Sequence, residues 1–434
     1  MKKRFAVGTV LTVALAGGVA LLLSGVASGK SSVTPLPSSS CGPIFYQGGG
    51  SPDYIIATDL PMQGAGRAQI LAMGKAVRYV LSQQYKFKAG KYKIGYQECD
   101  DSTAQKGAWD SAKCTANGRN YANNKSVVGV LGTFNSGCAK LELPILNRAP
   151  GGAVAMLSTA NTAVGLTHNA SWNDPGEPNI YYPTGVRNYA RVSASDDFQG
   201  PAAADLLKQL AKVTSVYVIH DNQTFGKGVA NAFRQRAQKL GIKVLGFEPW
   251  DPAATDYTAI GQRIKDSGAQ SVYLGGIVCN NGVKLLKDLR SVVGDKPVFV
   301  GPDGWTPYSA TLGAGSAAQK MYISYAGLPL SKLSKTGQSW IAGFKAYAKL
   351  SGQVPPYSVY QGQAAQVMLD AIARSDGTRA SVTKEMFKTN VKNGIMGNFK
   401  FDKNGDTIPL KAISFDQIRG QEGKYAFVVI SKVT

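Results

Sequence analysis

The stretch from residue 128 to residue 144 reads VGVLGTFNSGCAKLELP, and its character changes in the middle. An apolar run ends in the small, polar string GTFNSG at 132–137, and a segment with a helical pattern follows. A buried run, a loop and a helix form one step of a parallel α/β sheet. Ser136 stands at the start of the expected helix, where a hydroxyl can be a nucleophile, a helix cap or a ligand contact.

The same alternation of short apolar runs and longer amphipathic stretches continues along the chain. Expected strands lie at 54–60, 92–98, 127–132, 215–221, 243–250, 271–276 and 298–304. Expected helices lie between them, and two long helical patterns follow at 339–352 and 360–375. The order predicts an α/β fold with two doubly wound parallel-sheet lobes. We expect lobe 1 to comprise 53–190 and 326–390, and lobe 2 to comprise 191–325 and 391–434.

The amino terminus has the layout of a secretory signal. Lys2, Lys3 and Arg4 precede a long apolar run that ends in small residues, which predicts a signal peptide over 1–28. An uncleaved membrane anchor is the alternative, because the run is long enough to cross a bilayer. Val26 stands where a lipoprotein signal has its lipidated cysteine, so cleavage without lipidation is favoured. We therefore expect an exported bacterial protein, periplasmic, extracellular or associated with the cell envelope.

Composition and charge limit the kinds of binding partner that are expected for this chain. The Ser-, Pro- and Gly-rich stretch at 29–52 predicts a flexible spacer. The chain has 434 residues, 44% of them hydrophobic, and a formal net charge of +21. Its basic residues are scattered and are not interleaved with aromatic residues, which argues against nucleic-acid binding. A basic exported protein is instead attracted to an anionic envelope, an effect that salt weakens.

Five cysteines in an exported chain allow two disulfides. Spacing favours a bridge between Cys99 and Cys114, with two buried thiols as the alternative. The roles of Cys41, Cys138 and Cys279 stay open.

The loops after the expected strands hold the candidate site residues, because ligands of open parallel sheets bind beyond the carboxyl ends of the strands. These loops contain Ser136, the string LSTANTAVGLT at 157–167, Phe225 and Asp303. Each has a structural alternative: a helix cap for Ser136 and for 157–167, a core side chain for Phe225, and a turn for Asp303.

Enzyme chemistry has little support. The string GTFNSG is not a G-x-S-x-G elbow, and His168 and His220 are the only histidines available as a base. Zinc spacings, a P-loop and a dinucleotide fingerprint are missing from the sequence, so we expect neither a metal nor a cofactor. The string DKNGD at 402–406 predicts a hairpin turn and not a calcium loop, because Ile413 occupies the position of the bidentate glutamate.

Taken in order, several strings resemble one family. They are DLPMQGAGRAQILAMGKAV, QECDDSTA, VVGVLGTFNSGCA, LSTANTAVGLT, HDNQTFGKGVANAF, DPAATDYTAIGQRI, VFVGPDG, VYQGQAAQVMLDAI and KFDKNGDT. The chain from about residue 54 to 434 is similar to the branched-chain amino acid binding proteins, the substrate-binding components of ABC importers. The resemblance implies a type I periplasmic binding fold, in which two lobes close about a hinge over a ligand in a central cleft.

The resemblance also implies roles for individual residues. Ser136 matches the serine that binds the ligand carboxylate, together with the backbone at Ala160 and the hydroxyl and N–H of Thr162. Asp303 matches the acidic residue that receives the α-ammonium group from the other lobe. Phe225 matches a tyrosine common in the family, so it keeps the apolar cover and loses a hydroxyl.

Three further residues belong to the expected site. Asn135 adjoins Ser136, and Arg67 and Ile277 replace apolar or aromatic residues of the family. Arg67 either binds a second carboxylate or points to solvent.

The leading hypothesis is a monomeric receptor that captures an amino acid or a related small polar metabolite and delivers it to an ABC permease. A sensory ectodomain anchored through residues 5–27 is the second hypothesis. An exported serine hydrolase that uses Ser136 is the third, and the shortage of histidines argues against it.

Overall fold

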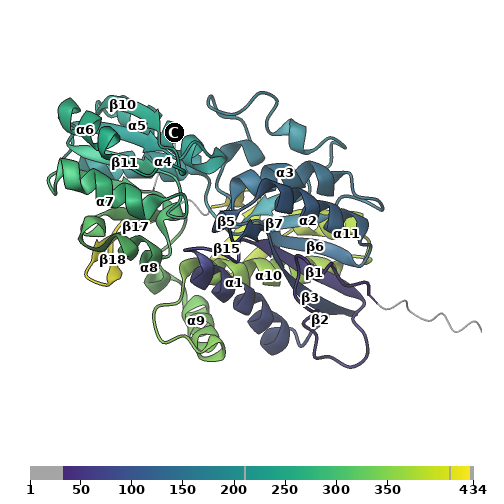
Figure 1. The fold of residues 1–434 in the computed structure, drawn as a ribbon. Coiled ribbons are helices and arrows are strands. Elements are labelled where there is room, and N and C mark those ends of the chain that lie inside the picture. The colour runs from purple at the N-terminus through teal and green to yellow at the C-terminus, as the bar shows by residue number, and fades with distance from the viewer. Residues whose placement is uncertain (1–32, 210–211, 410–411, 431–434) are drawn as a thin grey trace, which may run out of the picture. The chain divides into compact units, whose positions relative to one another are not determined.

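The computed structural model describes residues 33–209, 212–409 and 412–430, with the backbone alone for 422–430. The expected signal peptide or anchor at 1–28 lies outside the described residues. Within them, the chain forms a six-stranded sheet, a seven-stranded sheet and two small sheets, with helices against the large sheets (Figure 1). The same ranges contain no helix with the length and apolar character that a membrane crossing requires.

The first large sheet has the strand order β2-β3-β1-β6-β7-β8, and only β2 and β3 are antiparallel neighbours. Its strands are β1 (Tyr54–Leu60), β2 (Lys88–Ala89), β3 (Tyr92–Asp100), β6 (Val127–Gly132), β7 (Ala155–Ser158) and β8 (Tyr189–Arg191). Ile55 and Ala57 point to one face and Ile56 and Leu60 to the other, because side chains alternate along a strand. All four are fully buried, as a parallel sheet covered on both faces requires.

Two groups of helices provide this cover. The helices are α1 (Arg67–Tyr79), α2 (Ser111–Asn123), α3 (Ser136–Asn147), α9 (Lys335–Ala348), α10 (Pro356–Arg374) and α11 (Arg379–Phe387). Apolar residues of α1, α9 and α10 form one core with Ile56, and those of α2 and α3 form the other with Ile55. The small hairpin of β4 (Ser102–Thr103) and β5 (Ala108–Trp109) precedes α2. Asp110 caps α2 by accepting hydrogen bonds from the backbone N–H groups of Ala112 and Lys113.

The second large sheet has the order β10-β9-β11-β12-β13-β17-β18. Its strands are β9 (Ser215–His220), β10 (Lys243–Pro249), β11 (Ser271–Gly275), β12 (Val298–Gly301), β13 (Tyr322–Tyr325), β17 (Ala412–Arg419) and β18 (Glu422–Ile430). Its helices are α4 (Asp196–Gln209), α5 (Thr224–Lys239), α6 (Thr258–Ser267), α7 (Gly282–Val293) and α8 (Tyr308–Thr311). Val216 and Val218 pack with α4 and α5, whereas Tyr217 and Ile219 pack with α6 and α7. The strands from β10 to β13 are parallel, and β17 and β18 extend the sheet in antiparallel fashion.

A small antiparallel sheet follows α11 and contains β14 (Asn390–Gly394), β15 (Gly397–Phe401) and β16 (Thr407–Ile408). Phe401 pairs with Thr407, which confirms the predicted hairpin turn at 402–406. Ile395, Phe399 and Phe401 belong to the first core together with Ile56. The exact lobe boundaries stay a prediction, and this packing favours assigning 395–401 to lobe 1 instead of lobe 2.

The chain passes between the two large sheets in neighbouring segments. It leaves β8 for α4 through residues 192–195, and it leaves the second sheet after β13. The backbone N–H of Ala194 donates to the carbonyl oxygen of Ala326 at 3.3 Å, so the two passages lie side by side. This is where the family resemblance implies a hinge.

The disulfides differ from the expected pairing of Cys99 with Cys114. Cys41 is bonded to Cys99, Cys114 is bonded to Cys138, and Cys279 is free. Cys41 lies opposite Cys99 in an antiparallel bridge beside β3, and Cys114 on α2 faces Cys138 on α3 with 5.5 Å between their Cα atoms. The expected pairing was wrong because sequence spacing does not show that α2 packs against α3.

Residues 33–52 are fixed to the first sheet, in contrast to the expected flexible spacer. Besides the Cys41 disulfide, Phe45 and Tyr96 exchange two backbone hydrogen bonds of 2.7 and 3.1 Å. Leu36 is buried in the core beside α2 and α3. This segment therefore acts as an added edge of the lobe.

Candidate functional site

The loop after β6 presents Asn135 and Ser136 at the start of α3. Asn135 occupies the position before the first helical residue, and neither side chain caps the helix. The Ser136 hydroxyl is buried and accepts a hydrogen bond of 3.3 Å from the backbone N–H of Ala163. Ser136 thus joins the loop after β6 to the loop after β7, at a helix N-terminus that favours anions.

The loop after β7 is held from within. Ser158 Oγ accepts hydrogen bonds from the backbone N–H groups of Ala160 and Asn161, and it donates to the carbonyl oxygen of Thr133 at 2.9 Å. Ala160 is buried, and Thr162 is fully buried with no hydrogen-bond partner for its Oγ1. A polar atom left unpaired in the interior is uncommon and requires an explanation.

A buried arginine side chain holds the loop after β7 through several hydrogen bonds. Arg191, at the end of β8, donates to the carbonyl oxygens of Asn161 and Ala163 at 3.2 and 2.8 Å and to Thr167 Oγ1 at 2.6 Å. Its Nε donates to Asp406 Oδ1 at 2.6 Å, an ion pair in which the arginine side chain is fully buried. The turn at 402–406, which the sequence showed only as a hairpin, therefore supports the predicted ligand loop.

His168 extends this ion-pair network. Its two ring nitrogens lie 3.0 Å from Asp406 Oδ2 and 2.9 Å from Asp197 Oδ2. Burial opposes protonation, yet the hydrogen bonds to Asp197 and Asp406 raise the pKa of His168 to about 9. Burial likewise opposes ionisation of Asp406, but Arg191 and His168 hold the pKa of Asp406 well below its usual value. All four side chains, including Asp197, are charged at neutral pH.

Asp303 lies beyond β12 in the short helix η4 (Asp303–Trp305) and is 4% exposed. Its Oδ2 accepts a hydrogen bond from the hydroxyl of Tyr357 on α10, while its Oδ1 has no partner in the described part of the chain. Burial raises the pKa of Asp303 to about 6, and the bond from Tyr357 opposes this rise. The carboxylate is therefore charged at neutral pH without a cation beside it.

Asp196 is a second acid that the sequence did not single out. It begins α4, is fully buried, and has an Oδ2 without a partner. Gln199 links it to Asp303: Gln199 Nε2 donates to Asp196 Oδ1 at 3.1 Å, and Gln199 Oε1 accepts from the backbone N–H of Asp303 at 3.0 Å. Burial and the charge of Asp303 raise the pKa of Asp196 well above its usual value. The backbone N–H of Asp196 donates to the carbonyl oxygen of Thr162, so the two acids adjoin the loop after β7.

Apolar side chains cover the same region. A Cβ on Gly304 would lie 2.7 Å from Ile277 Cγ2 and 2.8 Å from Phe225 Cε1, so only glycine fits between them. A cavity of about 30 Å³ lies nearby, and its walls include Gln63, Phe134, Asn135, Ile277, Cys279 and Thr306. The Phe134 ring meets the Tyr357 ring edge-on at 5.6 Å between centroids, which connects this cover to Asp303.

Arg67 takes no part in this arrangement. Its side chain is exposed and donates to the carbonyl oxygen of Met62 at 2.7 Å, and it is not among the residues that line the cavity. Of the two roles left open for it, the structure supports the solvent-facing one.

The histidines give Ser136 no base. His168 is bonded to Thr167, Asp197 and Asp406, and His220 Nδ1 accepts from the backbone N–H of Asn222 at 3.1 Å. Burial lowers the pKa of His220 to about 4, so this side chain is neutral. Both serve local structure, and the nucleophile reading of Ser136 loses its support.

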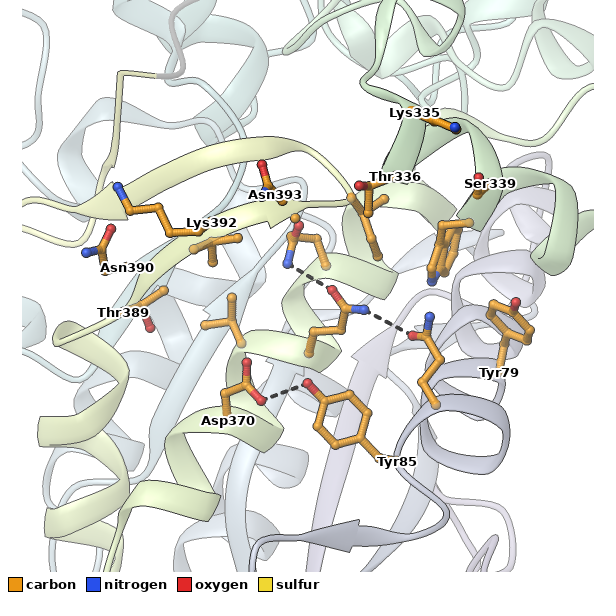
Figure 2. Close-up of a pocket in the computed structure, with 18 of the residues that line it drawn as sticks. Tyr79, Tyr85, Lys335, Thr336, Ser339, Asp370, Thr389, Asn390, Lys392 and Asn393 are labelled. Atoms are coloured by element: carbon orange, nitrogen blue, oxygen red, sulfur yellow. Dashed lines mark hydrogen bonds between the residues drawn. The ribbon is translucent and has the colours of Figure 1, made fainter.

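A larger cavity lies elsewhere and contains none of the predicted site residues. It measures about 730 Å³ and is lined by α9, α10, β14 and residues 79–85 (Figure 2). Hydrogen bonds connect parts of its wall: Tyr85 donates to Asp370, and Gln366 donates to Gln84 at 3.1 Å. We place the candidate site at the strand ends, where buried charged groups lack partners.

Comparison with known proteins fits this geometry. A model of the periplasmic binding protein family matches residues 56–421. The chain belongs to this family. Membership confirms the prediction of a binding protein and excludes the serine-hydrolase alternative.

Curated relatives also match part of the chain. An amino acid binding protein from Pseudomonas aeruginosa is 28% identical over 225 residues, which are 51% of this chain and 58% of that protein. A leucine-, isoleucine-, valine-, threonine- and alanine-binding protein from the same organism is 28% identical over 226 residues, again 58% of its length. The matched region thus spans little more than half of these relatives. The resemblance to branched-chain amino acid binding proteins is confirmed.

Solved structures show the same fold. A leucine-binding protein from Thermotoga maritima has a TM-score of 0.74 and 19% identity, over 87% of this chain and 98% of its own. A solute-binding protein from R. palustris in complex with benzoate has a TM-score of 0.68 and 17% identity, over 87% and 98%. These likenesses confirm the predicted fold, two parallel-sheet lobes of the type I periplasmic binding proteins.

The structure brings most of the predicted site residues to one region. Ser136, Ala160 and Thr162 lie on adjoining loops of the first sheet, and Phe225, Ile277 and Asp303 lie at the strand ends of the second. Asp196, Tyr357 and Arg191 contribute to this region but were not predicted from the sequence. A weak signal was available for Asp196, since the string SASDDF follows a short strand as the other site strings do.

Proposed function

We propose that this protein captures an amino acid or a related small polar metabolite by closure of its two lobes. The observation that carries the proposal is a group of buried polar atoms that form no well-aligned hydrogen bond with the described residues: Thr162 Oγ1 and Asp196 Oδ2, which face each other, and Asp303 Oδ1. An unsatisfied buried polar group costs about 1–3 kcal/mol, and more when it is charged. A ligand that supplies the missing partners recovers this cost on binding.

The carboxylate of the ligand is assigned to the first lobe. Ser136, the backbone at Ala160 and the hydroxyl of Thr162 surround the N-terminal end of α3, where hydrogen-bond donors and the helix dipole favour an anion. Bonds from neutral donors to an ionised acceptor are short and strong, so a positive side chain is not required.

The cationic group of the ligand is assigned to the acids. Asp303 and Asp196 share Gln199, and their unpartnered oxygens offer acceptors to an ammonium group. Tyr357 already donates to Asp303 and orients its carboxylate. Two acids at this end favour a zwitterion or a ligand with an extra cation over a dicarboxylate, and the exposed Arg67 gives a dicarboxylate no support.

Access to the site requires motion. The cavity of about 30 Å³ is far smaller than the 300–1,000 Å³ typical of small-molecule pockets. Separation of the lobes about the paired passages at Ala194 and Ala326 is the simplest way to admit a ligand. Asn135, Phe225 and Ile277 then cover the ligand when the lobes close.

The cellular setting is part of the same proposal. We infer an exported, monomeric protein that presents its closed form to the permease of an ABC importer. The support is family membership and the amino acid binding named for its relatives.

Isothermal titration calorimetry tests the proposal against a panel of amino acids, amides, aromatic acids and small dicarboxylates. We expect a zwitterionic amino acid to bind, Asp303→Asn and Ser136→Ala to weaken it, and Arg67→Ala to bind as the parent does. If both the Asp303 and the Ser136 variants bound the ligand with the affinity of the parent, the site assignment would be contradicted. A preference for dicarboxylates would contradict the assignment of the acids to a cation.

A further inference from the structure

A second group of buried acids lies in the first lobe, inside the layer between the sheet and helices α2 and α3. Asp59 is on β1, Asp101 follows β3, and Glu142 is on α3, and each is 0% exposed. None of the three forms an ion pair with a Lys, Arg or His side chain of the described chain. Three carboxyl groups therefore share an interior region without a cation.

The polar atoms around these acids are also left over. Asp101 Oδ1 has no hydrogen-bond partner among the described residues, and the carboxyl groups of Asp59 and Glu142 face each other with one oxygen each, Asp59 Oδ2 and Glu142 Oε2, that forms no well-aligned hydrogen bond. Asn117 donates to Asp59 Oδ1 at 2.8 Å, which leaves its own Oδ1 without a partner among the described residues, and the Tyr121 hydroxyl lies within hydrogen-bonding reach of Asp59. Asn117 and Tyr121 are fully buried on α2. Each of these atoms is an oxygen able to accept, as is typical around a bound cation.

The Cys114–Cys138 disulfide lies in the middle of this group. Cys138 Sγ is 3.6 Å from Asp101 Oδ2 and 3.8 Å from Glu142 Oε1. Donor atoms of Asp101, Cys114 and Cys138 lie within 4.8 Å of one another, and so do those of Asp59, Cys138 and Glu142. Gly118 lets α2 approach this place closely, since a Cβ there would lie 3.3 Å from Glu142 Cγ.

We propose that, when the Cys114–Cys138 disulfide is reduced, the two cysteines bind Zn²⁺ together with Asp101 and Glu142. Two thiolates and two carboxylates suit a closed, four-coordinate zinc site, whereas calcium and magnesium select oxygen ligands alone. Asp59, which accepts a hydrogen bond from Asn117, has an oxygen within 4.8 Å of Cys138 and Glu142 and adjoins the site as a further acceptor. The disulfide and the zinc site are alternative states of one location.

A dithiol reductant transfers two electrons and two protons to the S–S bond, which breaks into the thiols of Cys114 and Cys138, and the dithiol becomes a cyclic disulfide. Zn²⁺ then replaces the two thiol protons, which pass to solvent. The two thiolate charges balance the 2+ charge of the metal, and the metal lies beside the two carboxylates as a cation.

The backbone permits this change. Two thiolates on one zinc ion lie about 3.8 Å apart, given Zn–S bonds of about 2.3 Å in tetrahedral geometry. The Cα atoms of Cys114 and Cys138 are 5.5 Å apart on two neighbouring helices, so rotation of the side chains is sufficient.

Cobalt substitution tests the proposal directly. The full chain is unfolded, reduced and refolded under a non-thiol reductant without oxygen, with Co²⁺ or without metal. We expect a thiolate-to-cobalt charge-transfer band and the visible bands of tetrahedral Co²⁺ at one ion per chain, lost on adding Zn²⁺. Zn²⁺ should also raise the thermal midpoint of the reduced protein, and the oxidised protein should show neither effect.

Variants separate this site from other thiols. Cys114→Ser with Cys138→Ser should abolish the band, and Asp101→Asn and Glu142→Gln should each lower Co²⁺ affinity at least tenfold. Cys279→Ser should leave the spectrum unchanged. A band that survives in the double cysteine variant would assign the metal to other cysteines. Absence of a band in the refolded reduced parent, or failure of Zn²⁺ to support its refolding, would overturn the proposal and leave the acids as proton-sharing carboxyl groups.

Discussion

Two consecutive aspartates at the start of α4 have opposite environments. Asp197 is bonded to His168 and Ser195, and although burial opposes it, these bonds hold its pKa below the usual value. Asp196 is fully buried with one oxygen unpaired, and burial raises its pKa. The first belongs to a neutralised network that fixes the shape of the loop at 159–167. The second belongs to a pair of acids without an ion-pair partner at the proposed ligand cleft, so the comparison separates side chains that hold the site from side chains that await a ligand.

The largest expected effect comes from breaking the neutralised network at its centre. Arg191→Met should lower the free energy of unfolding by about 3–5 kcal/mol, because Asp406 keeps only His168 as a cationic partner and the buried carbonyl oxygens of the loop lose their donor. Urea unfolding measures this change. The matched control is Arg263→Met, whose ion pair with Glu248 is half exposed and should contribute less than about 1 kcal/mol. Similar losses in both variants would contradict the distinction.

The unneutralised group should respond in affinity and not in stability. Asp303→Asn should weaken ligand binding by about 2–3 kcal/mol, because the ligand cation loses a buried counter-charge. Since the folded-state pKa of about 6 exceeds the ordinary value, the Asp303 carboxylate costs stability as pH rises from about 4 to 6. The variant should therefore be at least as stable as the parent at pH 7. Calorimetric titration and urea unfolding measure the two effects, and a clear loss of stability would assign Asp303 to the framework.

The two neighbouring aspartates provide the sharpest test. Asp197→Asn should destabilise the fold by roughly 2 kcal/mol, because His168 and Ser195 lose a charged acceptor. Asp196→Asn should leave stability equal or higher and reduce ligand affinity. Urea unfolding and calorimetric titration of both variants under one set of conditions measure these effects. Changes in stability of the same sign and size in the two variants would contradict the proposed difference between Asp196 and Asp197.

The smallest effect concerns pH. His168 has a pKa raised to about 9 in the fold, against about 6.5 when unfolded. Its contribution is therefore complete below pH 6.5 and is lost as pH rises through 9. Unfolding at several pH values should show a difference between the parent and His168→Gln that shrinks from pH 6 to pH 10. A difference that does not vary with pH would place the stabilisation elsewhere.

Much of the fold was predictable because strand and helix periodicities are local. The runs at 54–60, 127–132 and 215–221 all form strands of the two large sheets, and Ser136 and Phe225 follow the second and the third of them, as the parallel-sheet rule requires. The same rule placed Asp303 at the end of β12. Local sequence patterns were sufficient to place a site residue wherever its position depends only on the strand that precedes it.

Pairings between distant segments were not predictable. Arg191 and Asp406 are 215 positions apart, and Tyr357 reaches Asp303 from a helix assigned to the other lobe. Asp196 and Asp197 are identical in sequence terms, and only the packing of α4 distinguishes them. The cysteine pairing was predicted wrongly for the same reason, since the disulfide partners depend on which helices and which sheet edges are neighbours in the fold.

The turn that carries Asp406 also has a consequence for the order of folding. The chain is synthesised from its amino terminus, so the loop at 159–167 is complete long before the residue that braces it exists. A contact across 215 positions closes late, because the entropy of the intervening chain opposes it. Ligand competence should therefore be among the last properties that a newly made chain acquires, which keeps incomplete chains from sequestering the solute.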